Sequence, residues 1–198
     1  MTIAALQPGL PDPVRDSQTV FRVLMEAMAR PGTVGRILPR VQPPPPLTPG
    51  MAALVLTLCD SDTPVWLDAG LAASPGVADF IRFHTAAPIV SESGEAAFAL
   101  VSASARLPSL ERFALGTIDY PDRSTTLIVA VETLDTGAGW RLRGPGIDGE
   151  ARLAASPLPA DFAGQRAALA PLFPRGLDMV FVAGDRLAAL PRSTRVEL

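Results

Sequence analysis

All 17 basic side chains in this 198-residue sequence belong to arginine, and the chain contains no lysine. It has one histidine, His84, and one cysteine, Cys59. A pyridoxal enzyme needs a lysine amine for its Schiff base, and a P-loop needs the lysine that follows its second glycine, so both classes are excluded. One histidine cannot form a histidine cluster for a metal ion. The composition therefore favours binding or assembly over self-sufficient catalysis.

Two arginines precede a glycine-flanked turn. Arg141 and Arg143 alternate along an expected strand that ends at Gly144 and Gly146. Alternation places both guanidinium groups on one face, about 6.5–7 Å apart along the strand. Guanidinium forks bind phosphate or phosphonate through parallel hydrogen bonds, and exposed backbone amides assist. The simpler alternative is a solvated strand face that leads into an ordinary turn, and Pro145, which supplies no amide hydrogen, weakens the interpretation as a phosphate site.

A second arginine pair lies near the C-terminal end of the sequence. Arg192 and Arg195 bracket Ser193 and Thr194. Arginines beside hydroxyl groups form an anion site, but they also form surface ion pairs or contacts with another subunit. The sequence leaves these three interpretations open.

The remaining chemically active residues have simpler explanations. His84 is a candidate ligand-binding residue or general acid/base, or else a hydrogen-bonded residue at a helix end. Asp60 and Asp62 either hold a magnesium ion that accompanies a nucleotide or form a turn. Cys59 follows an apolar run and is expected to be a buried small hydrophobe. We therefore predict no catalytic residue, no metal site and no cofactor.

Charge and hydropathy limit the partners. The net charge is −3, and no basic stripe suits a nucleic-acid backbone. No run of about 18 apolar residues predicts a membrane span, and the N-terminal residues do not resemble a signal peptide. A single cysteine indicates no oxidising compartment. These features predict a cytoplasmic protein with a proline-rich arm at residues 1–15 and a single α/β domain at 16–198.

The apolar pattern predicts alternating helices and strands. In the first helix, capped by Asp16 or Ser17, we expect an inner face of Val20, Phe21, Leu24, Met25 and Met28. Further helices are expected at 51–59, from Ser74 onward, at 107–115 and at 160–172, and strands at 33–38, 65–67, 88–90, 96–101, 125–133, 140–143, 177–183 and 186–190. A turn is expected at 135–139. This order predicts a layered mixed sheet flanked by helices.

Five motifs, taken in order, resemble one known family, the PhnH subunit of the carbon–phosphorus lyase system. The first is Phe21-Arg22-x-x-Met25-x-Ala27-Met28-x-Arg30-Pro31-Gly32. The others are Leu56-Thr57-Leu58 with Asp60-x-x-Thr63-Pro64-Val65-Trp66-Leu67, then Arg82-Phe83-His84-Thr85, then Leu142-Arg143-Gly144-Pro145-Gly146-Ile147, and finally Leu190-Pro191-Arg192-Ser193-Thr194-Arg195-Val196-Glu197. The resemblance spans about residues 12–198.

This resemblance implies a role in phosphonate degradation. Members of the family belong to a multi-subunit core complex that replaces the adenine of ATP with an alkylphosphonate, which gives a ribose 1-phosphonate 5-triphosphate. The resemblance implies a fold similar to the large domain of pyridoxal-dependent transferases, without a pyridoxal site. It also implies a homodimer when the subunit is isolated, and other subunits as partners. We expect a non-catalytic accessory subunit; the alternative is a component that binds ATP or phosphonate directly and contributes arginines to a shared active site.

Overall fold

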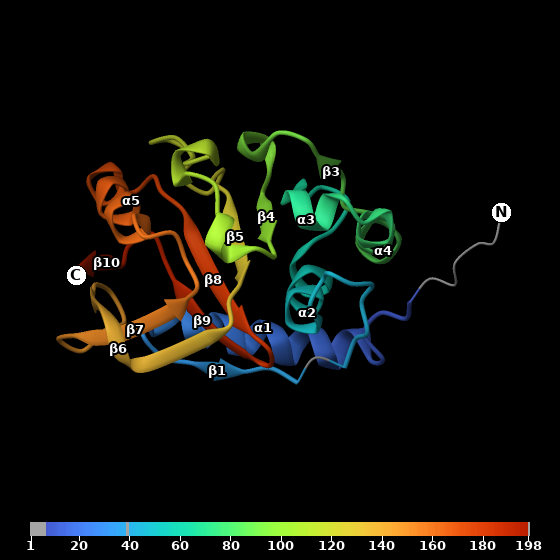
Figure 1. Ribbon diagram of the computed structural model, residues 1–198, viewed down its shortest axis with the longest axis horizontal. Coiled ribbons are helices and arrows are strands. Elements are labelled where there is room, and N and C mark those ends of the chain that lie inside the picture. Colours follow the sequence, from blue (N-terminus) through green and yellow to red (C-terminus); the bar gives the residue numbers. More distant parts are fainter. Residues whose placement is uncertain (1–6, 39, 198) are drawn as a thin grey trace.

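The computed structural model describes residues 7–38 and 40–197, and in these residues the chain forms two β-sheets with helices around them (Figure 1). The larger sheet has the strand order β1-β9-β8-β5-β4-β2-β3, and the smaller has the order β10-β6-β7. The strands are β1 (Gly35–Arg36), β2 (Val65–Leu67), β3 (Ile89–Val90), β4 (Phe98–Val101), β5 (Thr126–Ala130), β6 (Thr133–Arg143), β7 (Ala151–Ser156), β8 (Asp178–Ala183), β9 (Arg186–Leu190) and β10 (Arg195–Glu197). The predicted mixed α/β architecture is thus confirmed.

The helices are α1 (Pro13–Ala29), α2 (Pro49–Leu58), α3 (Ala69–Ala72), α4 (Pro75–Thr85) and α5 (Phe162–Leu169). Short 3-10 turns occupy Ser93–Glu95, Ser104–Arg106, Leu110–Arg112 and Ala170–Leu172. Sequence signals explain where the helices start. Thr48 caps α2 and accepts a hydrogen bond from the Met51 amide, and Pro49 occupies the first turn, where its missing N–H costs nothing.

The larger sheet is apolar on both faces. Strands β3, β2, β4, β5 and β8 run parallel, and β9 returns antiparallel to β8. In β5, Ile128 faces the core shared with α1, α2 and α4, whereas Leu127 and Val129 face a second core shared with α5 and the smaller sheet. Burial on both faces requires the continuous apolar runs seen in β5 and β8.

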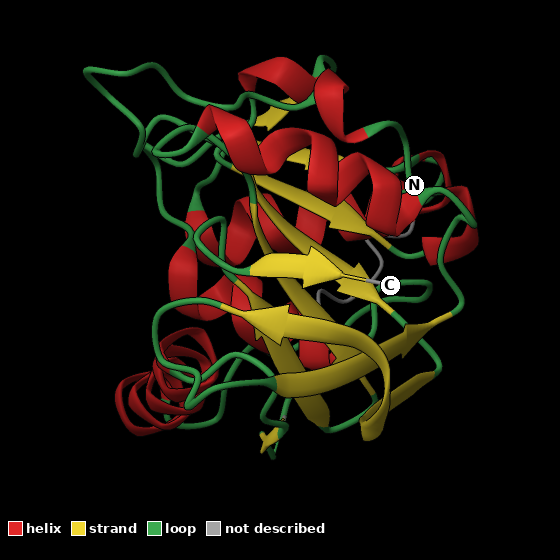
Figure 2. Cartoon of the chain, turned by 90° about the vertical axis from the view of Figure 1, so that its left-hand side faces the viewer, coloured by secondary structure: helices red, strands yellow, loops and turns green. Residues whose placement is uncertain are grey.

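The smaller sheet covers one end of the molecule. Leu142, Leu153 and Val196 turn inward from its three strands and join the second core. Figure 1 shows β6, β7, β10 and α5 at one end of the long axis, with α3 and α4 at the other. Figure 2 looks on to the end formed by the smaller sheet, near the C-terminal end of the chain. Because side chains alternate along a strand, the residues next to these inward-facing positions point outward, and the outward face of this sheet is polar.

The structure corrects the expected inner face of α1. Val20, Leu24 and Ala27 are buried, but Phe21 and Met25 are 48% and 47% exposed. The helix also begins earlier than expected, because Pro13 forms its first turn and the Asp12 carboxylate accepts a hydrogen bond from the Arg15 amide at 3.1 Å. The predicted division between residues 15 and 16 therefore lies inside α1.

Two other expectations about local structure are wrong. Residues 107–115 contain only the 3-10 turn Leu110–Arg112 instead of a helix. Residues 135–139 do not form a turn that separates two strands; β6 passes through them, with a register shift between Asp135 and Trp140 in its pairing with β7. Strands β6 and β7 stay paired on both sides of this register shift, so β6 continues past the expected turn.

Candidate functional site

The outward face of the smaller sheet carries most of the arginines singled out by the sequence. Alternation holds as predicted, since Leu142 is buried while Arg141 and Arg143 point outward. In the antiparallel register, Arg195 of β10 lies directly opposite Arg143, and Arg152 of β7 lies directly opposite Arg141. Two pairs of like charges therefore stand side by side on one face.

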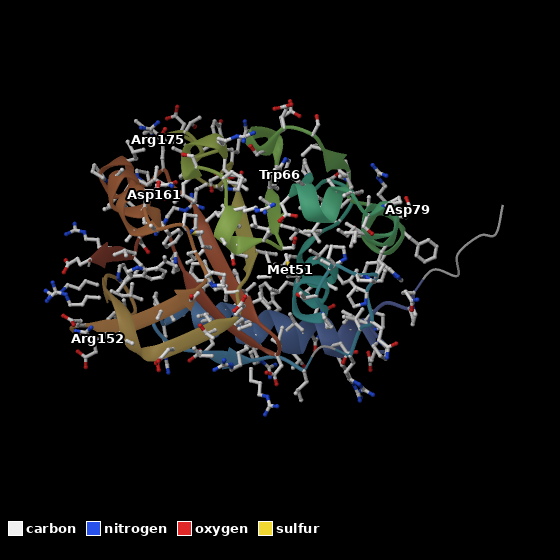
Figure 3. All side chains as sticks on the ribbon, viewed as in Figure 1. Met51, Trp66, Asp79, Arg152, Asp161 and Arg175 are labelled. Carbon is white, nitrogen blue, oxygen red and sulfur yellow. The ribbon has the colours of Figure 1, made fainter. Side chains whose placement is uncertain are left out.

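Two carboxylates partly neutralise this face. Glu150 lies 3.3 Å from Arg143 and 3.8 Å from Arg152, and Glu197 lies 3.7 Å from Arg141. None of the ion pairs found in residues 7–38 and 40–197 involves Arg195. Figure 3 shows Arg152 pointing outward at this end of the molecule.

A cavity of about 350 Å³ opens beside the Arg143–Arg195 pair. It is lined by Arg143, Gly144, Pro145, Ala170, Phe173, Arg192, Ser193 and Arg195. The structure thus brings together four of the seven predicted ligand-binding residues, from two sequence segments about fifty positions apart. Arg141 lies outside the cavity lining, on the same sheet face.

Arg192 is fixed in place by an acidic partner. Its Nε donates to Oδ1 and Oδ2 of Asp178 at 3.2 and 3.1 Å, its Nη2 donates to Oδ2 at 2.5 Å, and its Nη1 donates to the carbonyl of Pro121. The Arg192 amide also donates to Asp178 at 2.7 Å. Both side chains are largely buried, so Arg192 forms a rigid wall of the cavity instead of a mobile arm.

Arg166 was not identified from the sequence, yet its side chain binds the backbone of the turn that forms one wall of the cavity. This residue of α5 is 4% exposed, and its guanidinium donates to the carbonyls of Leu177 at 2.8 Å, Pro191 at 2.9 Å and Thr194 at 3.3 Å. Burial lowers the pKa of Arg166 from its ordinary value to about 10, although the nearby Asp178 acts in the opposite direction. The position looked like any polar residue of an expected helix, and only the folded arrangement shows that it faces inward.

The two predicted glycines have different roles. A Cβ on Gly144 would lie 2.8 Å from the carbonyl oxygen of Ser193, so glycine lets the turn after β6 approach the turn before β10. Gly146 instead packs against the end of α1: its φ is +79°, and a Cβ there would lie 1.8 Å from the Ala29 oxygen. Gly144 belongs to the cavity, and Gly146 holds the turn against the domain.

Comparisons with known proteins identify the family. The family model described as bacterial phosphonate metabolism protein (PhnH) matches residues 8–197. The chain belongs to the PhnH family. It is 45% identical over 186 residues to the α-D-ribose 1-methylphosphonate 5-triphosphate synthase subunit PhnH of Rhizobium meliloti (strain 1021), which covers 94% of this chain and 92% of the relative. It is 32% identical over 185 residues to a Stutzerimonas stutzeri protein named HtxG and described as a C-P lyase subunit, which covers 91% of this chain and 86% of that relative.

The candidate histidine of this PhnH-family chain lies away from the arginines. His84 is on α4, at the opposite end of the molecule from β10 (Figure 1). Its Nε2 lies 3.0 Å from the carbonyl oxygen of Gln7, and its ring makes edge contacts with Phe80 and Phe83. His84 therefore lies apart from the cavity lined by Arg143, Arg192 and Arg195, and its contacts agree with its interpretation as a hydrogen-bonded structural residue.

Asp60 and Asp62 form a turn. Asp60 accepts hydrogen bonds from the Thr63 hydroxyl at 2.6 Å and from the Asp62 amide at 3.0 Å, and these bonds lower the pKa of Asp60. Cys59 is buried, and burial together with the charge of Asp60 raises its pKa to about 12. Across the described residues, no cluster of three or more potential metal ligands was found, and no described helix has the length and apolar character to cross a membrane.

Open α/β sheets often bind ligands at the carboxyl ends of their parallel strands. Here Asp68, directly after β2, is saturated by local bonds. It accepts from the amides of Ser102, Ala103 and Leu71 at 2.7, 3.0 and 2.9 Å. A cavity of about 290 Å³ nearby is lined by small and apolar residues with one charged side chain, Glu132. An anionic ligand is therefore better accommodated beside the smaller sheet.

Proposed function

We propose that this chain is a subunit of the enzyme complex that makes α-D-ribose 1-methylphosphonate 5-triphosphate from ATP and methylphosphonate, with release of adenine. The observation that best supports this proposal is the 45% identity, over nearly the full length of both chains, to a protein named as a subunit of that synthase. The similarity to a described C-P lyase subunit supports the same pathway. This role places the chain in the cytoplasm, where ATP is available.

We assign the chain an accessory role without catalysis of its own. The sequence has no lysine, and its one histidine contacts a backbone carbonyl and two aromatic rings. The cysteine is buried with a raised pKa, which removes the reactive thiolate at neutral pH. The alternative, in which this chain binds ATP or phosphonate through its arginines, has a specific geometric basis that is developed in the next subsection.

Assembly requires a surface for partners, and α1 offers one. Val14, Phe21 and Met25 lie on one side of the helix at spacings of seven and four residues, and all three are exposed. Exposed apolar side chains in a row are typical of a surface that a partner covers. We assign this side of α1 to the contact between two copies in the isolated homodimer.

Co-expression with the other subunits, followed by mass measurement of the intact assembly, tests the subunit role. We expect this chain to co-purify stoichiometrically, and its absence from the assembly would refute the role. Purified alone, it should release no adenine from ATP and methylphosphonate. Adenine release by the isolated chain would contradict the accessory assignment.

The homodimer is tested by light scattering on the isolated chain. The expected mass is twice the 20.7 kDa of one chain. Phe21→Ser with Met25→Ser should shift the mass towards that of one chain, while Ile118→Ser, a similarly exposed apolar residue elsewhere, should not. Equal effects of both changes would contradict the assignment of α1.

We also propose that the fold of this chain is similar to that of the large domain of pyridoxal-dependent transferases. A mixed sheet with parallel central strands and the antiparallel β9 supports it. An experimental structure superposed on such a domain tests this likeness, and strand orders that fail to coincide would reject it.

A further inference from the structure

We infer that the cavity between Arg143, Arg192 and Arg195 binds a phosphorus oxyanion, the tetrahedral group shared by phosphate esters and phosphonates. This assigns to the chain a ligand site of its own, which goes beyond a purely accessory role in assembly. The inference does not rest on the subunit assignment, because it depends on the charges and geometry of one surface.

The first argument is the unfavourable placement of charge. Arg143 faces Arg195, and the neighbouring Arg141 faces Arg152. Like charges directly opposite each other across two strands are destabilising. The four arginines carry +4 and their two glutamates, Glu150 and Glu197, carry −2, so these six side chains leave +2 on one face of a small sheet. An anion held between Arg143 and Arg195 would neutralise the part of that excess that lies beside the cavity.

The second argument is the capacity of the guanidinium groups. Arg195 is absent from the ion pairs of the described residues, and Arg143 uses one terminal nitrogen for Glu150 at 3.3 Å. Directly opposed residues have Cβ atoms about 4.5–5.5 Å apart, so both forks reach a single group between them. Two forks can satisfy three or more oxygens, which suits a tetrahedral phosphorus group better than a carboxylate with two oxygens.

The third argument is that the cavity walls are fixed before any ligand arrives. Asp178 holds Arg192 in a two-point contact, and Arg166 holds the turn from Pro191 to Thr194 through two carbonyls. A site whose groups are already ordered loses less conformational entropy on binding. Arg192 adds positive potential from a rigid position while Arg195 and Arg143 supply donors.

The fourth argument concerns the organic part of the ligand. The cavity volume of about 350 Å³ exceeds the space that a phosphate group requires, and lies in the range of about 300–1,000 Å³ typical of small-molecule sites. Phe173, Pro145 and Ala170 form apolar wall beside the arginines. Phe173 is 62% exposed, so its ring is available to an organic substituent. The site therefore fits an organic phosphate or phosphonate.

Isothermal titration of the isolated full-length chain with ATP, tripolyphosphate and methylphosphonate tests the inference. At low salt we expect at least one of these to bind with a Kd of about 1 mM or tighter. Binding of ATP and tripolyphosphate but not of methylphosphonate would identify a polyphosphate chain as the ligand. Binding of methylphosphonate but not of tripolyphosphate would identify a phosphonate. No heat from any of the three at about 10 mM would overturn the inference.

Variants separate the cavity from the general charge of the face. Arg195→Ala and Arg143→Ala should each weaken binding by about tenfold to a hundredfold, the loss typical of a charge-assisted bond. Arg195→Lys keeps the charge but not the fork, so it should recover only part of the affinity. Arg152→Ala removes the same charge from the same face outside the cavity, and should change the Kd by less than about threefold.

Equal losses in Arg152→Ala and Arg195→Ala would refute the site, as would equal binding of citrate, because either result would reflect general attraction of anions. Thermal unfolding of each variant establishes that it is folded. Arg195→Ala should still enter the multi-subunit assembly. Loss of ligand binding with assembly retained therefore separates this inference from the subunit role.

Discussion

Replacement of Arg166 by methionine is the sharpest test of how the cavity is held. The change keeps a long side chain in the core of α5 but removes the donors to Leu177, Pro191 and Thr194. Those three carbonyls belong to the start of β8 and to the turn before β10. Through these three hydrogen bonds, the Arg166 guanidinium connects α5 to the wall of the cavity.

Two effects of opposite sign set the magnitude. Hydrogen bonds to a charged group contribute about 1.5–3 kcal/mol each, so the three bonds together contribute ~4.5–9 kcal/mol. Burial lowers the pKa of Arg166 to about 10, and this decrease from the ordinary value corresponds to a penalty of ~3 kcal/mol on the charged guanidinium. Removing the side chain relieves the penalty and loses the bonds. The difference, a loss of ~2–6 kcal/mol in the free energy of unfolding, favours a destabilised variant.

Urea unfolding followed by circular dichroism measures this difference directly. Thermal unfolding gives a second measure: for a chain of this size, each kcal/mol lowers Tm by about 2–4 °C, so Tm should fall by roughly 4 °C or more. Arg152→Met, an exposed arginine on the smaller sheet, serves as control and should change stability by less than ~0.5 kcal/mol. An Arg166→Met variant as stable as the parent would refute the reasoning, because the charge penalty would then outweigh the bonds.

Other residues give equally specific expectations. The raised pKa of Cys59 favours the protonated thiol in the folded state, so the contribution of this thiol to the free energy of unfolding is fully present below pH 9.0 and is lost as the pH rises towards about 12. Relative to the Cys59→Ala variant, the parent should lose ~1.4 kcal/mol of stability per pH unit across that window, as measured by denaturant titrations. Parallel curves of stability against pH for the two proteins would contradict the burial of the thiol. Gly146→Ala should cost ~3 kcal/mol or more, since the new Cβ would collide with the Ala29 oxygen. Gly149→Ala, with φ +69° and open space around it, should cost only ~1–2 kcal/mol in the same unfolding assay, and equal costs would show that backbone conformation alone matters.

The sequence predicted the buried elements well, because their apolar patterns leave little freedom. The strand Val65–Leu67 and the hairpin between β8 and β9 appear where expected. Helix α2 lies within a residue or two of its expected range. Burial on both faces of a parallel sheet demands apolar runs, and few other structures share that pattern.

The errors come from features that depend on distant partners. Phe21 and Met25 have the spacing of a core face, but apolar periodicity does not distinguish burial in the core from exposure to a partner. Asp135 and Gly139 carry turn signals, but β6 pairs with β7 both before and after them, so the strand continues through this segment. Strands β7 and β10 went unnoticed because three of the six residues of β7 are alanine, which does not favour strands, and β10 is only three residues long.

The candidate site shows the same division between local and distant information. Alternation alone placed Arg141 and Arg143 on one face, and the structure agrees. The opposition of Arg143 to Arg195 requires the β10–β6 register, which joins residues more than fifty positions apart and leaves no mark in either segment. Arg166 is harder still, because a buried arginine in a short helix has the same sequence surroundings as an exposed one, and only the carbonyls of Leu177, Pro191 and Thr194 show its direction. Candidate binding residues can therefore be proposed from their types, whereas the residue that holds them in place is visible only after the chain has folded.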